Sequence, residues 1–64
     1  MHNEVIKTMS ATYWREDGKL HRDGDLPAVV WNNGDKEWYQ KGERCRADGK
    51  PVVERGDGGV EYAS

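Results

Sequence analysis

The sequence has no phenylalanine, a single cysteine and only two prolines among its 64 residues. A lone cysteine excludes an internal disulfide and is typical of a reducing compartment, so we expect a cytoplasmic protein. Hydrophobic residues make up 34% of the chain, which limits it to one small domain. A core of this size rarely supplies more than about 3–5 kcal/mol. We therefore expect a dimer or a domain stabilised by a partner.

Long runs of any one kind are also missing. Ten basic and twelve acidic side chains are mixed along the chain and leave a net charge of −2. Without a run of lysine or arginine, nothing indicates a phosphate-binding surface, and we do not expect a nucleic-acid partner. No apolar stretch has the length of a signal peptide or a membrane span, so we expect neither.

What the sequence does contain is a repeat at a spacing of 24 residues. Trp14 falls on Trp38, and Trp38 on Tyr62, without a gap. The other matched pairs are Gly18–Gly42, Arg22–Arg46, Pro27–Pro51, Val29–Val53, Gly34–Gly58 and Glu37–Glu61. A period of this length indicates a supersecondary unit that stacks on its neighbour, because it cannot bury its own apolar face. The predicted division of the single domain 1–64 is an N-terminal edge segment (1–11), repeat one (12–35), repeat two (36–59) and the start of a third (60–64).

Each repeat has the pattern of short strands joined by tight turns. β-Branched and aromatic residues favour strands, and the glycine, asparagine and aspartate clusters between them favour turns. The predicted strands are 12–16, 20–22, 27–31, 36–40, 44–46, 51–55 and 60–63. Residues 4–9 are either an additional edge strand or a helical turn, and the adjacent Val5 and Ile6 favour a strand. The fold class predicted is all-β, a small antiparallel meander of about seven strands.

Both faces of the predicted sheet carry apolar groups, because side chains alternate along a strand. Tyr13 and Tyr39 point away from the neighbouring Trp14 and Trp38. A single-layer sheet with two partly apolar faces is poorly stable alone in water. This pattern again predicts a dimer or a docked partner.

The stretch HRDGDLPAVVWNNGDKEWYQKGERCRADGKPVV, from His21 to Val53, resembles a tandem β-hairpin repeat, W-Y-x-x-G-x-x-H-R-x-x-x-x-P-A-V. Such repeats occur in proteins of bacteriophages and large DNA viruses and are loosely similar to MORN-type repeats. The resemblance covers roughly residues 12–62, although Cys45 stands where the first copy has His21. It implies a small phage protein that binds a host protein and blocks it. Inhibitors of host defence, including anti-CRISPR proteins, are one class of such binders.

Residues with reactive side chains do not form a recognisable site. His2, His21 and Cys45 lack the close spacing of zinc ligands, and we predict no metal or cofactor. Cys45 and His21 could pair as nucleophile and base, but 64 residues leave little room for a pocket that excludes water. We therefore predict no enzyme. The glycine-rich stretches 32–35 and 56–59 are predicted hairpin turns, because no helix follows either one.

Positions that do not repeat are the better candidates for recognition. Trp31 corresponds to Arg55 and Tyr39 to Ala63, while Tyr13 has no aromatic counterpart. Tyrosine and tryptophan are enriched at interface hot spots, although these rings could equally be the core of a protein without phenylalanine. The acidic residues predicted to meet a basic patch on a partner are Asp17, Asp23, Asp25, Asp35 and Glu37; a solvated surface is the alternative.

Positions that do repeat are predicted to build the scaffold. Arg22 and Arg46 would then cap the aspartate-rich turns or cover an aromatic ring, and a partner contact is the alternative. The predicted structural set is Trp14, Trp38, Tyr62, Arg22, Arg46, Pro27 and Pro51.

The function predicted is therefore protein binding, with three alternatives. A structural viral repeat protein would self-assemble. A single-stranded nucleic-acid binder would stack bases on its aromatic rings, and would need a basic face from Lys36, Lys41, Arg44, Arg46, Lys50 and Arg55. A small enzyme would depend on Cys45 and would be inactivated by its alkylation.

Overall fold

The computed structural model describes residues 3–63, and this part of the chain is all-β. Its strands are β1 Asn3–Lys7, β2 Ala11–Glu16, β3 Lys19–Leu20, β4 Val29–Trp31, β5 Lys36–Glu37, β6 Tyr39–Gln40, β7 Glu43–Arg44, β8 Val53–Glu54 and β9 Val60–Glu61. A single 3-10 turn lies at Ala47–Gly49 within these residues. The predicted all-β class is confirmed. None of the described segments is a helix of the length and apolarity that a membrane crossing requires.

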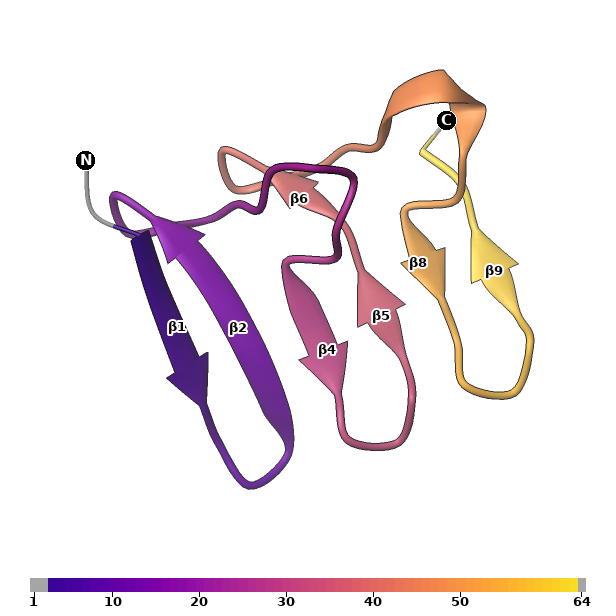
Figure 1. The fold of residues 1–64 in the computed structure, drawn as a ribbon. Helices are drawn as coiled ribbons and strands as arrows, with labels where there is room; N and C mark the ends of the chain where they lie inside the picture. Colours follow the sequence, from indigo (N-terminus) through magenta and orange to yellow (C-terminus); the bar gives the residue numbers. More distant parts are fainter. Residues whose placement is uncertain (1–2, 64) are drawn as a thin grey trace.

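Three hairpins, β1–β2, β4–β5 and β8–β9, lie side by side in one antiparallel sheet of seven strands (Figure 1). The strand order is β1-β2-β4-β5-β8-β9, and β3 pairs with β2 outside this path. Strands β6 and β7 form a separate two-stranded ribbon. The sheet therefore follows the order of the chain, as predicted for a meander.

The strand predicted over 36–40 is divided at Trp38, and each half pairs in a different sheet. The backbone N–H of Trp38 donates to the Val52 carbonyl (2.8 Å), while its own carbonyl accepts from Cys45 (3.3 Å). Trp14 makes the same two kinds of bond inside β2, to Ala28 (2.8 Å) and from His21 (3.0 Å). Each tryptophan thus marks the point where a strand changes its partner.

An arginine guanidinium lies over each of these two tryptophan rings. The Cζ atom of Arg22 is 3.7 Å from the ring centroid of Trp14, and that of Arg46 is 3.8 Å from that of Trp38. Each arginine also donates to a carbonyl five residues on, Arg22 to Pro27 (3.2 Å) and Arg46 to Pro51 (3.0 Å). At the third position of this spacing, Tyr62 is exposed.

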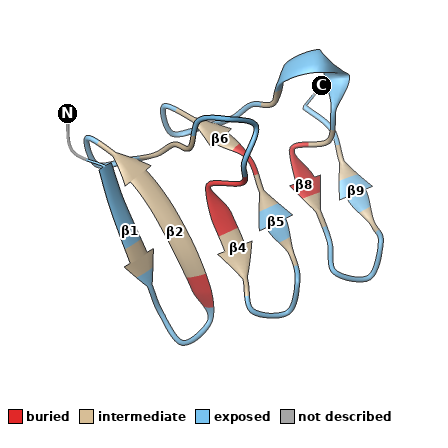
Figure 2. Ribbon diagram, viewed as in Figure 1, coloured by how far each residue is buried: buried red, intermediate tan, exposed pale blue. Residues whose placement is uncertain are grey.

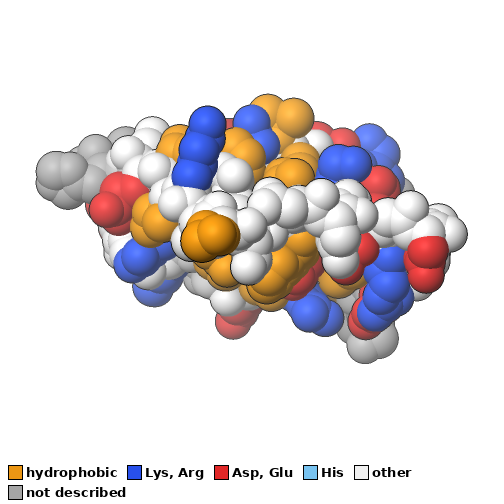
Figure 3. Space-filling model, turned by 90° about the horizontal axis from the view of Figure 1, so that it is seen from below, with side chains coloured by type: hydrophobic (Ala, Val, Ile, Leu, Met, Phe, Trp, Pro, Cys, Tyr) orange, Lys and Arg blue, Asp and Glu red, His pale blue; other side chains and the backbone are white. Residues whose placement is uncertain are grey.

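The core is a thin line of small side chains along the middle of the sheet (Figure 2). The buried hydrophobic residues among those described are Ala11, Ala28, Val29, Trp38, Val52 and Val53. The molecule measures 32 × 28 × 16 Å, which is the thickness of one sheet with its side chains. Figure 3, seen from the hairpin turns, shows hydrophobic side chains on both sides of this slab. Neither face is covered by a second layer.

Neighbouring hairpin turns contact one another along the lower edge in Figure 1. The N–H of Asn32 donates to the Ser10 carbonyl (2.8 Å), and that of Gly56 donates to the Asp35 carboxylate (2.7 Å). A Cβ atom on Gly56 would overlap the Asn33 carbonyl oxygen. Gly56 is thus required by the close approach of two turns.

We expect Gly56→Ala to lower the free energy of unfolding by about 1–3 kcal/mol, the usual range for overpacking. Gly59→Ala is the matched control, because the nearest atoms to its Cβ belong to the side chains of Asp57 and Arg55. Urea unfolding followed by tryptophan fluorescence measures both. Equal losses in the two variants would contradict the packing described for Gly56.

Candidate functional site

Three aromatic side chains predicted for recognition lie close together on one face of the sheet. The register pairs Ala11 with Trp31 and Tyr13 with Val29, so Tyr13 and Trp31 are diagonal neighbours on one face. Their ring centroids are 6.2 Å apart at 81°, an edge-to-face contact that rings favour. Tyr39 joins them from β6 through Glu37. We call Tyr13, Trp31 and Tyr39 the aromatic cluster.

The carboxylate of Glu37 fixes two members of this cluster. Oε2 accepts from the indole N–H of Trp31 (2.8 Å), and Oε1 accepts from the Tyr39 hydroxyl (3.0 Å). Arg44 adds an ion pair at 3.5 Å, and the Glu37 side chain is only 17% exposed. Hydrogen bonds to a charged group contribute about 1.5–3 kcal/mol each. The pKa of Arg44 is raised, first by the hydrogen bond to Tyr39 and then by Glu37.

The same geometry occurs 24 residues later with different chemistry. Val29 pairs with Glu37 and Val53 pairs with Glu61. Where Trp31 donates to Glu37, Arg55 forms an ion pair with Glu61, which Arg44 also approaches at 3.8 Å. This face is therefore aromatic over the first repeat and charged over the second.

The remaining acidic residues predicted for recognition are not brought together. Asp25 binds Arg46 (2.9 Å) and Lys50 (3.0 Å), and Asp35 caps the N–H of Gly56. The pKa of Asp25 is lowered to about 2, first by Arg46 and then by Lys50. Asp17 lies in the turn after β2. These carboxylates stand in separate turns and form no single acidic patch.

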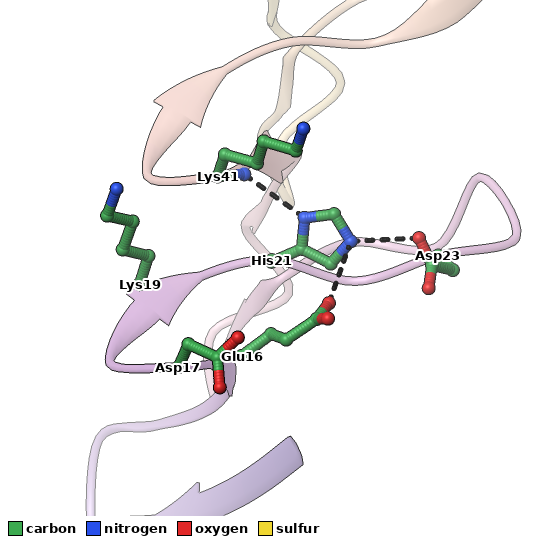
Figure 4. Close-up of a pocket in the computed structure, with 6 residues that line it drawn as sticks. All are labelled: Glu16, Asp17, Lys19, His21, Asp23 and Lys41. Carbon is green, nitrogen blue, oxygen red and sulfur yellow. Dashed lines mark hydrogen bonds and ion pairs between the residues drawn. The ribbon is translucent and has the colours of Figure 1, made fainter. Parts of the chain in front are cut away.

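A histidine cluster that sequence reasoning missed lines an open pocket of about 590 Å³ (Figure 4). The Nε2 atom of His21 lies 2.8 Å from Asp23 and 3.2 Å from Glu16. Glu16, His21 and Asp23 offer one ligand atom each within 4.8 Å of one another, a spacing that could hold a metal ion. The H-x-D spacing was the available signal, but Glu16 comes from a different strand.

The hydrogen bond on the other side of the ring decides what this cluster can do. The backbone N–H of Lys41 donates to Nδ1 of His21 (3.1 Å), so the proton of the neutral ring lies on Nε2. A metal at Nε2 would require that atom to be unprotonated, and would turn a protonated Nδ1 toward the Lys41 N–H. The arrangement favours a hydrogen-bonded junction that ties the 41–42 turn to β3 over a metal centre.

Comparison with known proteins gives no relative: no family model, no curated protein and no solved structure matches the chain. The resemblance to tandem hairpin repeats therefore stays a prediction from the residues. What the chain does must be inferred from its surfaces.

We expect Glu37→Ala to lower the free energy of unfolding by about 1–3 kcal/mol, because it leaves the Trp31 N–H and Tyr39 hydroxyl without their acceptor. Glu43→Ala, on the exposed strand β7, should change it by less than about 0.5 kcal/mol. Urea unfolding of both variants is the measurement. If Glu43→Ala costs as much, the carboxylate does not organise the cluster.

Asp25 predicts a loss of stability in acid. Because its pKa is depressed in the folded state, ionised Asp25 stabilises the fold above its ordinary pKa of 3.8, and this contribution disappears as the pH falls toward about 2. The stability difference between wild type and Asp25→Asn should be constant near pH 6 and shrink to zero near pH 2. A difference that does not change with pH would rule out this linkage.

Proposed function

We propose that the chain is a small protein-binding module that acts by covering a surface of its partner. The observation that carries this proposal is the aromatic cluster, in which half-buried rings lie on an uncovered sheet face. Tyrosine and tryptophan are the residues that most often dominate protein interfaces. The module would perform no chemistry.

Preorganisation supports this role. Trp31 and Tyr39 already satisfy their polar atoms through Glu37, so a partner that covers the rings strands no hydrogen-bond donor. Their side chains are also held in place before binding, which lowers the entropic cost of association. Few other features of so small a chain combine apolar area with fixed geometry.

The most specific form of the proposal is an inhibitor of the phage type, acting in the host cytoplasm. It would occupy a functional surface of a host defence protein, for example of a CRISPR-Cas system, and block it sterically. This form rests on the resemblance of residues 12–62 to phage hairpin repeats. The aromatic cluster supports protein binding and leaves the host target open.

A repeated unit and a dimeric or partner-stabilised state are part of the same proposal. The contacts of Arg22 with Trp14 and Pro27 recur 24 residues later, which supports the repeat as the building unit. The single-layer sheet, with its thin core, supports stabilisation by a second chain or a partner.

Nucleic-acid binding is less well supported, because most of the basic residues it would need are paired inside the chain. Arg44 approaches Glu37 and Glu61, and Arg55 pairs with Glu61. Arg46 and Lys50 share Asp25. Cations neutralised in this way release few counterions from a phosphate backbone.

The test is capture from bacterial lysate with Trp31→Arg, the side chain that the equivalent position 55 carries. Arginine can keep a partner for Glu37 while removing the ring, so the variant is expected to fold, which circular dichroism checks. Wild type should retain one host protein at moderate salt, and Trp31→Arg should reduce recovery at least tenfold.

The matched control is Tyr62→Ala, which removes an exposed aromatic outside the cluster and should capture as wild type does. The captured protein, purified, should then lose its activity on stoichiometric addition of the chain. Capture that Trp31→Arg leaves unchanged, or recovery only of nucleic acid that washes off in salt, would refute the proposal.

A further inference from the structure

Strand β1 forms an outer edge of the seven-stranded sheet. It pairs with β2 over five residues, from Asn3–Glu16 to Lys7–Thr12, and no other described strand pairs with it. Four of its five residues are exposed, and Val5 is 56% exposed. An edge of this kind presents unpaired backbone groups to any strand that fits it.

The direction of those groups follows from one hydrogen bond. The N–H of Thr8 donates to the Ala11 carbonyl (2.8 Å), in the same register as the β1–β2 pairs. Hydrogen-bonded pairs alternate along an antiparallel ladder, so Glu4 and Ile6 also bond to β2. The N–H and C=O groups of Asn3, Val5 and Lys7 therefore point outward.

This edge lacks the features that normally protect an exposed strand. Its register with β2 is continuous over all five pairs, without a bulge, and its sequence NEVIK contains no proline. Natural edges are commonly blunted by prolines, bulges or inward-pointing charges. The central outward residue here is Val5, which is apolar.

We propose that two copies of this chain pair through β1, antiparallel, about a two-fold axis at Val5. A two-fold axis perpendicular to a sheet pairs residues on the same face, so Val5 meets Val5 of the other copy. Asn3 then lies opposite Lys7, and Glu4 opposite Ile6. All five residues of β1 are paired, and all outward backbone groups find a partner.

Charge and apolar contacts favour this register over its neighbours. An axis at Glu4 would oppose two carboxylates, which is unfavourable. An axis at Ile6 would leave Asn3 and Glu4 unpaired and set Lys7 against Val5. The register at Val5 opposes no like charges.

The axis at Val5 also covers the most exposed apolar residue of β1. Because Val5 pairs with Trp14 within the chain, the dimer forms a continuous row on one face: Trp14, Val5, then Val5 and Trp14 of the other copy. The pairing gives the occupant and geometry for the dimer expected under the proposed function. It does not depend on the identity, or the existence, of a host partner.

Cross-linking of the purified chain tests the register. Residues directly opposite in a hydrogen-bonded antiparallel pair have Cα atoms about 5.5 Å apart, within the range of a disulfide. In a Cys45→Ser background, Val5→Cys should give a disulfide-linked dimer on mild oxidation. Glu4→Cys and Ile6→Cys should each cross-link at least tenfold more slowly, because neither residue faces itself. Equal rates at the three positions would overturn the proposal.

Sedimentation equilibrium of the unmodified chain tests the edge itself. Wild type should associate to a dimer as its concentration rises. Val5→Pro removes only an outward N–H, a substitution that edge strands tolerate, and should weaken association at least tenfold. Val5→Thr, which keeps the N–H and the β-branched shape, should remain dimeric. A wild type that stays monomeric up to millimolar concentration, or a Val5→Pro variant that dimerises equally well, would refute pairing through β1.

Discussion

A guanidinium lying flat on an indole ring takes the place of a second structural layer in this protein. The sheet is one layer thick, so a large ring at its centre has no opposing sheet or helix to pack against. Arg22 over Trp14 and Arg46 over Trp38 supply that cover, and each also binds a nearby carbonyl. Such contacts contribute up to about 2 kcal/mol when water is excluded. The strands change partners beneath them.

The two repeats share a scaffold and differ in what they display. Glu37 and Glu61 occupy the same place in the ladder, and each holds the side chain that projects from the preceding strand. That side chain is Trp31 in one case and Arg55 in the other. The glutamate is thus a fixed support, although the sequence predicted Glu37 as a free acidic contact. The interchangeable position beside it determines the character of the surface.

Strands and turns could be predicted because they depend on local signals: β-branched and aromatic runs, glycine turns and the 24-residue period. The partner change at Trp38 could not, since alternation shows which face a side chain takes and not which strand pairs with it. The same limit hid the junction at His21, whose Nδ1 is held by a backbone N–H 20 residues away. Asp25 likewise reaches Lys50 across a whole repeat. Tyr13 and Trp31 were singled out from the residues, but their contact depends on the β2–β4 register.

The order of strands in the sheet has a consequence for how the protein is made. Each hairpin contacts the hairpin before it and the one after it, so long-range pairing is never needed to begin the sheet. Chains rich in local contacts fold quickly, because little loop entropy is lost before contacts form. As the chain leaves the ribosome, β1 and β2 can close first and offer an edge to β4, and β5 can later receive β8. Folding can therefore keep pace with synthesis, one hairpin at a time.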